Sequence, residues 1–133
     1  MNKKYLYIGF AALFGTSLRA GIGVLMKGIS FPYSTLIINI IASFSLVILY
    51  RYVKQSGFLP EITVAAIGTG LIGSFSTMSA VAYDTSFFIL NNQLAEAVLN
   101  YSANMLLCLL AALAGLAYSQ VLIKLDKECK VQS

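Results

Sequence analysis

The chain has 133 residues, of which 59% are hydrophobic and 11% are charged, and its formal net charge is +4. Soluble domains carry about 25% charged residues, and a short soluble fold leaves much of its surface in contact with water. The composition therefore argues against a soluble helical bundle, and the length allows one compact unit. We predict an all-α membrane protein with a single transmembrane domain over residues 1–133.

Four apolar stretches are long enough to cross a hydrocarbon core of about 30 Å, which takes roughly 20 helical residues. The first is too long for the hydrophobic region of a cleaved signal peptide. Pro32 and Pro60 begin the second and third stretches, where proline is favoured because a first-turn N–H has no helical partner. The predicted transmembrane helices cover residues 5–26, 31–50, 62–90 and 97–123, and residues 124–133 form a polar tail.

Lysine and arginine are unevenly distributed between the two sides of this bundle. With four crossings, both termini and the second loop share one side, which carries seven basic residues, whereas Lys27 is alone in the opposite loops. Short loops and chain ends that are rich in lysine and arginine lie on the cytoplasmic side of a membrane, so we predict that both termini are cytoplasmic. This bias explains the net charge without a nucleic-acid partner. The seven residues are Lys3, Lys4, Arg51, Lys54, Lys124, Lys127 and Lys130.

Two ionisable residues interrupt the apolar stretches, Arg19 in the first and Asp84 in the third. Such residues are costly in a bilayer and are functional candidates by default. Arg19 lies in the outer third of its helix, so it either extends to the membrane surface or contributes to a site.

The third stretch is 29 residues long, more than one crossing needs, and its residues 68–79 hold three glycines and several hydroxyl side chains. Glycine weakens helices, and serine or threonine competes for backbone hydrogen bonds. The segment predicts either close packing by small residues or a helix broken around Gly73 to Ser76. Irregular backbone in a membrane survives where it is buried in protein or lines a watery cavity, and its freed carbonyls suit a cation.

Two pairs of polar residues are spaced to share a helix face, Thr35 with Asn39 and Asn100 with Asn104. An amide in lipid needs a partner, so these pairs either join helices by hydrogen bonds or line a pore with donors. Neutral donors suit a small anion because each directs a partial positive charge inward. The chain has no histidine, phosphate-binding loop or paired carboxylates, so we expect a channel or a small exchanger and not an enzyme.

Several motifs together resemble the Fluc, or CrcB, fluoride channel family over essentially the whole chain. The first helix contains Gly-x-x-x-Arg ending at Arg19, and the second contains Ser-Thr-Leu-Ile-Ile-Asn ending at Asn39. The third carries Gly-x-x-Gly from Gly70, then hydroxyl residues through Ser79 and Tyr-Asp at residues 83–84. The fourth carries Ala-Gly-Leu at residues 114–116.

The resemblance implies an antiparallel dimer in the cell membrane, surrounded by lipid, with two narrow pathways for passive export of fluoride. That export would lower the cytoplasmic concentration and the toxicity of fluoride. The resemblance also implies a structural sodium ion, Na+, held by the backbone carbonyls of Gly73 and Ser76.

Pore positions are implied by the same resemblance. Asn39 would donate its amide N–H groups to the passing fluoride, and Arg19 would raise the anion concentration in a vestibule. Thr35 and Ser79 would form a hydroxyl track, Met78 and Val81 stand at two pore phenylalanines of the family, and Asn100 and Asn104 stand at its tyrosine and serine.

The missing phenylalanines and the one-sided charge lead to one hypothesis. A chain that inserts in both orientations should have a weak basic bias, and the bias here is strong. We therefore expect a heterodimer with a related second subunit that supplies the phenylalanines. A homodimer that tolerates Met78 and Val81 is the alternative.

Two other functions stay open. One is a small four-helix, cation-coupled exporter similar to the small multidrug resistance proteins, which rely on a glutamate in their first helix. The first helix here contains Arg19 and no acid, which argues against this function. The other is a non-conducting partner subunit of such a channel.

Overall fold

The computed structural model describes residues 3–26 and 32–132, and these residues form helices and no strand. Four segments are long and apolar enough to cross a membrane, which confirms the predicted class of fold. Lys27 and the rest of the first loop lie outside the described residues. The segments are Lys4–Leu25, Tyr33–Ser56, Glu61–Leu90 and Leu94–Glu128.

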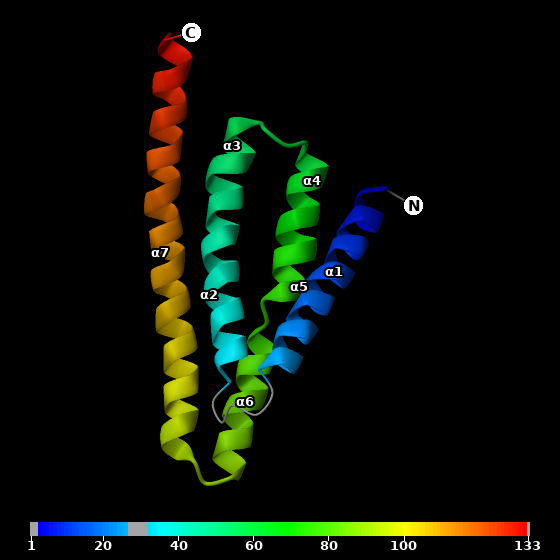
Figure 1. Ribbon diagram of the computed structural model, residues 1–133, viewed down its shortest axis with the longest axis vertical. Coiled ribbons are helices and arrows are strands. Elements are labelled where there is room, and N and C mark those ends of the chain that lie inside the picture. The colour runs from blue at the N-terminus through cyan, green and yellow to red at the C-terminus, as the bar shows by residue number, and fades with distance from the viewer. Residues whose placement is uncertain (1–2, 27–31, 133) are drawn as a thin grey trace.

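Two of the four segments contain π-helical stretches, labelled η, and the third is broken (Figure 1). The elements in chain order are α1 (Lys3–Leu25), α2 (Tyr33–Ile48), η1 (Leu49–Val53), α3 (Lys54–Ser56), α4 (Glu61–Ala65), η2 (Ala66–Ile72), α5 (Gly73–Phe75), α6 (Met78–Leu90) and α7 (Leu94–Gln132).

Both prolines directly precede a helix, as predicted. Pro32 stands before α2, and Pro60 stands before α4. The Pro60 carbonyl accepts hydrogen bonds from the N–H groups of Thr63 at 2.9 Å and Val64 at 3.1 Å. Proline at this position leaves no donor without a partner, because its own nitrogen carries no hydrogen.

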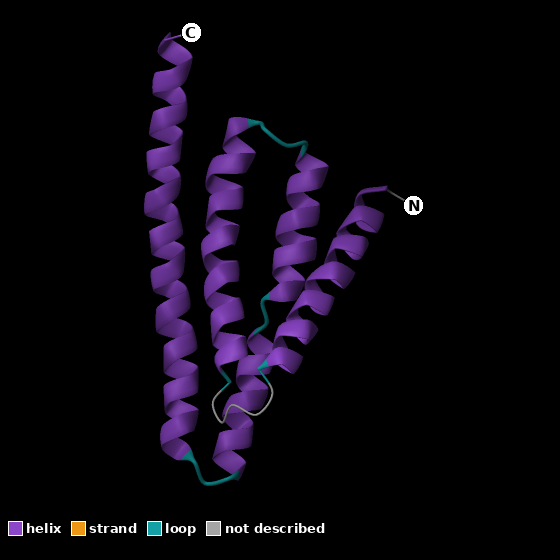
Figure 2. Ribbon diagram, viewed as in Figure 1, coloured by secondary structure: helices purple, strands orange, loops and turns teal. Residues whose placement is uncertain are grey.

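The helices form a bundle in which α7 lies along α2 and α6, while α1 packs against η2 and α5 (Figure 1). The start of α1, the turn from α3 to α4 and the end of α7 lie toward the same end of the bundle (Figure 2). This arrangement agrees with four crossings, and it gathers Lys4, Arg51, Lys54 and the last basic residues of α7 toward that end.

Glycines permit close helix contacts, as two examples show. A Cβ on Gly15 of α1 would collide with the Leu71 carbonyl and the Ser74 hydroxyl, and a Cβ on Gly115 of α7 would lie 2.8 Å from the Phe44 carbonyl. The Ser74 hydroxyl also donates to the Ala12 carbonyl at 2.9 Å, which joins α5 to α1. Small residues of this kind let membrane helices approach backbone to backbone.

The fourth helix is longer than the sequence pattern predicts. Instead of ending at residue 123, α7 continues through the polar segment to Gln132. Leucine, lysine and glutamate are good helix formers, and neither glycine nor proline follows Gly115, so nothing in this segment ends the helix.

Candidate functional site

The third membrane span is interrupted at Ser76 and Thr77, between α5 and α6. Both residues are extended, with φ −76° and ψ 144° at Ser76 and φ −153° and ψ 122° at Thr77. The Thr77 hydroxyl accepts a hydrogen bond from the Ala80 N–H at 3.4 Å and so caps α6. Extended residues cannot continue the helical ladder, so the neighbouring backbone groups need other partners.

Asn39 of α2 provides those partners. Its Oδ1 accepts from the Thr77 backbone N–H at 2.9 Å and from the Ser76 hydroxyl at 3.1 Å. Its Nδ2 donates to the Thr77 carbonyl at 3.3 Å and to Oδ1 of Asn104 on α7 at 3.1 Å. Only 7% of Asn39 is exposed. Asn39 therefore ties the break to both α2 and α7.

The hydrogen bonds continue from Asn104 along α7 and back to α6. Asn104 Nδ2 donates to the carbonyl of Asn100 at 3.0 Å and to its Oδ1 at 3.2 Å. Asn100 Nδ2 then donates to the Thr85 hydroxyl at 2.9 Å, and that hydroxyl donates to the Val81 carbonyl at 2.7 Å. Asn100 and Asn104 are almost completely buried, so this chain of amides lies inside the bundle.

Backbone groups fix the orientation of two of these amides. The Thr77 N–H can only donate, so it requires the oxygen of Asn39 and turns Nδ2 toward α7. The Asn100 carbonyl can only accept, so it requires the nitrogen of Asn104 and turns Oδ1 toward Asn39. The direction of the Asn39–Asn104 hydrogen bond is thus a consequence of backbone geometry.

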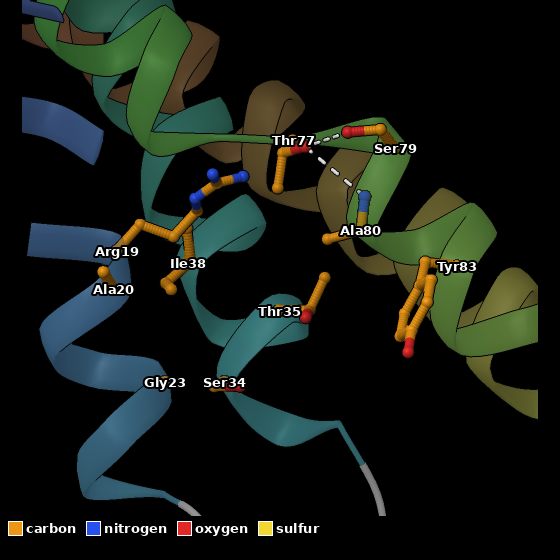
Figure 3. Close-up of a pocket in the computed structure, with 10 residues that line it drawn as sticks. All are labelled: Arg19, Ala20, Gly23, Ser34, Thr35, Ile38, Thr77, Ser79, Ala80 and Tyr83. Carbon is orange, nitrogen blue, oxygen red and sulfur yellow. Dashed lines mark hydrogen bonds between the residues drawn. The ribbon is translucent and has the colours of Figure 1, made fainter. Parts of the chain in front are cut away.

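A cavity of about 430 Å³ opens on one side of the break, between α1, α2 and the start of α6. Figure 3 shows Arg19 of α1 directed into this space, with Thr35 on one wall and Thr77 and Ser79 on another. The hydroxyl oxygens of Thr77 and Ser79 lie 2.8 Å apart. Arg19 is the one ionised side chain among the lining residues, so the cavity combines a positive charge with neutral hydroxyl donors.

Thr35 connects this cavity to the acidic residue of the third span. Its hydroxyl donates to Asp84 Oδ2 at 3.0 Å, and Asp84 is half-buried. The Thr35 hydrogen is therefore directed to a carboxylate, while its oxygen lone pairs are left for other donors.

A second cavity, of about 260 Å³, lies between α2, the break, the start of α6 and α7. Its walls include Asn39, Ser76, Met78, Asn104 and Cys108. Asn39 lines only this second cavity, whereas its chain neighbour Ile38 and its hydrogen-bond partner Thr77 line the first one.

Comparison with known proteins identifies relatives across most of the chain. A model of the family described as "CrcB-like protein, Camphor Resistance (CrcB)" matches residues 6–116. The chain belongs to the CrcB family. Its membership confirms the resemblance inferred from the motifs, and it makes this chain a multi-pass membrane protein.

Three relatives within this family carry names that state a function. A protein of Shewanella amazonensis named "Fluoride-specific ion channel FluC" is 36% identical over 121 residues, which cover 87% of this chain and 97% of the relative. "Fluoride-specific ion channel FluC 1" of Bacillus cereus is 32% identical, with 90% of each chain covered. A FluC protein of Campylobacter jejuni is 32% identical over 86% of this chain and 96% of its own length.

The residues that the sequence assigns to a pore are divided between the two cavities beside the helix break. Arg19, Thr35 and Ser79 line the first cavity, and Asn39, Met78 and Asn104 line the second. Val81 and Asn100 are fully buried between α6 and α7 and belong to neither wall. Met78, in contrast, is 49% exposed.

The break leaves the Gly73 and Ser76 carbonyls without their usual helical donors. The Ser76 N–H bonds to the Ile72 carbonyl at 2.9 Å, and the Thr77 N–H bonds to Asn39, so neither donor reaches the Gly73 carbonyl. Within the described ranges no hydrogen bond reaches the Ser76 carbonyl either. Carbonyl oxygens freed by a broken membrane helix suit sodium. In the same ranges there is no cluster of carboxylate, thiol or imidazole groups that would offer an alternative metal site.

The sequence pattern placed the break slightly too early and did not single out two participating threonines. Gly73 itself is helical, with φ −64° and ψ −32°, and the extended residues are Ser76 and Thr77. Thr77 supplies the cap of α6, and Thr85 ends the amide chain. A threonine placed before a helix start is a recognisable capping signal, whereas nothing in the sequence distinguishes Thr85.

Proposed function

We propose that this chain is a subunit of a fluoride channel that lets fluoride leave the cytoplasm passively and so limits its toxicity. The observation that carries the proposal is the family match together with relatives named as fluoride-specific channels over nearly their whole length. A cavity with one arginine and several hydroxyls beside a helix break supports it.

The chemistry of the lining residues suits a small, strongly hydrated anion. Arg19 raises the local anion concentration without surrounding the ion with charge, and a complete positive ring would bind the anion too tightly to release it. Neutral donors of Thr77, Ser79 and Asn39 then replace water molecules of the hydration shell. Asn39 is the candidate for the narrowest contact, because it lines the second cavity and is bonded to Thr77, which lines the first.

The proposed assembly is an antiparallel dimer with a central sodium ion. The Gly73 and Ser76 carbonyls of each chain would supply the sodium ligands, and the ion would hold the two breaks against each other. Sodium would act as a structural ion, while the pathway itself would be lined by Arg19 and by the neutral donors of Asn39, Thr77 and Ser79.

A related second subunit is the proposed partner. The basic residues gathered at one end favour a single orientation with cytoplasmic termini, and Met78 and Val81 lack the aromatic ring edges that stabilise an anion. The test is fluoride efflux from liposomes that contain the purified chain alone. Slow efflux is expected, whereas rapid efflux with both orientations present contradicts the heterodimer and favours a homodimer.

Labelling of engineered cysteines measures the orientation directly. Gln93→Cys, in the turn before α7, should react with an impermeant reagent added outside intact cells. Gln55→Cys in α3 should react only after the membrane is opened. Equal labelling of both positions from both sides would show dual insertion. The unsubstituted protein, with its native Cys108 and Cys129, gives the background reaction.

Fluoride export is tested in the cell that makes the protein, where any partner is also present. Deleting the gene should raise cytoplasmic fluoride and sensitise growth to fluoride but not to chloride. The wild-type gene and the matched control Asn91→Ala, in the exposed turn after α6, should restore resistance, whereas Asn39→Ala should not. Full rescue by Asn39→Ala would instead favour a non-conducting subunit.

A further inference from the structure

Both N–H groups of Asn39 are already bonded to protein oxygens. One donates to the Thr77 carbonyl at 3.3 Å and the other to Asn104 Oδ1 at 3.1 Å. An anion that binds Asn39 must therefore replace one of these two acceptors. Which acceptor yields determines how tightly the anion is held.

The two acceptors differ in how freely they can move. The Thr77 carbonyl is part of the backbone and has little freedom to move. The Thr77 hydroxyl caps α6, and the Thr77 N–H donates to Asn39. Asn104 presents a side-chain oxygen that can turn away by rotation of its own torsion angles. Asn104 also lines the second cavity beside Asn39, so an ion in that cavity meets the Asn39–Asn104 bond directly.

We propose that Asn104 Oδ1 is an internal competitor that occupies the Asn39 donor until fluoride displaces it. Asn104 is thus a positioning residue that sets the fluoride affinity of the pathway through Asn39. The inference rests on the proposed function. It adds a residue-level determinant of fluoride affinity, because a partly negative amide oxygen imitates the anion at the same donor.

Asn100 sets how firmly the competitor is held. Its carbonyl and Oδ1 accept the two hydrogen bonds that orient Asn104, at 3.0 and 3.2 Å. Oδ1 and Nδ2 of Asn104 belong to one planar amide, so turning Oδ1 away from Asn39 also moves Nδ2 relative to Asn100. Displacement therefore breaks the bond to Asn39 and loosens the two bonds to Asn100.

Asn104→Ser removes the hydrogen bond to Asn39 while a bond to the Asn100 carbonyl can still form. A serine hydroxyl can still donate to the carbonyl one turn earlier, but it is too short to reach Asn39. The variant is compared with wild type in fluoride efflux from membrane vesicles of the native cell lacking its own copy of the gene. The half-saturating fluoride concentration should fall about fivefold, which is the loss of a competing bond of about 1 kcal/mol at about 1.4 kcal/mol per tenfold.

Asn91→Ser is the matched control, because Asn91 also donates a side-chain amide to a carbonyl, that of Phe87 at 2.8 Å, but lies in an exposed turn. It should leave the half-saturating concentration unchanged. An unchanged or raised concentration in Asn104→Ser, in vesicles where wild type conducts, overturns the proposal for Asn104 alone. Wild-type vesicles that release fluoride no faster than vesicles without the protein overturn the proposed function as well.

A measurement on the wild-type protein covers the case in which the variant does not accumulate. Fluoride is titrated into isotope-labelled protein while the side-chain amide signals of Asn39 and the carboxamide carbon of Asn104 are followed by NMR. Displacement predicts that both signals shift with one midpoint. A shift of Asn39 without any change at the Asn104 carbon, or no shift of Asn39 at all, contradicts the proposal.

Discussion

Replacing Asn39 by alanine should destabilise the folded protein by removing the support of the helix break. The substitution deletes four hydrogen bonds, to the Thr77 N–H, the Thr77 carbonyl, the Ser76 hydroxyl and Asn104. Hydrogen bonds between membrane helices contribute about 0.6 kcal/mol each on average, so the four amount to about 2.4 kcal/mol. The Thr77 N–H is backbone and cannot rotate to a new partner, which makes this value a lower bound.

The free energy of unfolding is measured by titrating a denaturing detergent into the protein in mild micelles at a fixed protein concentration. Asn39→Ala should lose between about 2.4 and 4 kcal/mol, whereas the exposed control Asn91→Ala should lose less than about 0.5 kcal/mol. The double variant of Asn39 and Asn104 should lose less than the sum of the single variants, because both remove the same bond. A loss below about 0.5 kcal/mol for Asn39→Ala would refute the assigned role of this amide in the break.

Three further outcomes are expected. Gly115→Val should force α7 away from the Phe44 carbonyl and strongly lower the unfolding midpoint. Ala114→Val, on the exposed face, should change the midpoint little, and equal effects of the two variants would contradict the close contact. Arg19→Gln should reduce fluoride flux about three- to tenfold at low ionic strength and much less in high salt, whereas Arg51→Gln, outside the cavity, should not. Exchanging sodium for a large organic cation should lower the midpoint and stop flux reversibly, and insensitivity to sodium would exclude carbonyl ligation at the break.

The apolar pattern is sufficient to predict the number of crossings and most helix starts. Hydrophobic length identifies a span, and a proline before the first turn identifies where α2 and α4 begin. The break was also predictable in kind, since glycines and hydroxyl residues weaken a helix. Its position was displaced because glycine tolerates helical geometry, and the interruption occurs where Thr77 can cap the next helix.

The direction of the amides could not be predicted from their spacing. Asn100 and Asn104 share a face with or without a pore, and the spacing does not say which oxygen meets which N–H. That choice depends on the placement of α7 against the break, a relation between residues far apart in sequence. The π-helical stretches η1 and η2 were missed for a similar reason, because they involve one extra residue per turn and leave no distinct apolar period.

The interruption also divides one helix dipole into two. Each helix end carries about half an elementary charge, negative at the carboxyl end of α5 and positive at the amino end of α6. Partial charges of both signs therefore meet at Ser76 and Thr77 without any ionised side chain. The Asn39 amide is complementary to these partial charges, because its oxygen accepts from the Thr77 N–H and its nitrogen donates to the Thr77 carbonyl. One uncharged break can thus offer electrostatic attraction to a cation on one face and to an anion on the other.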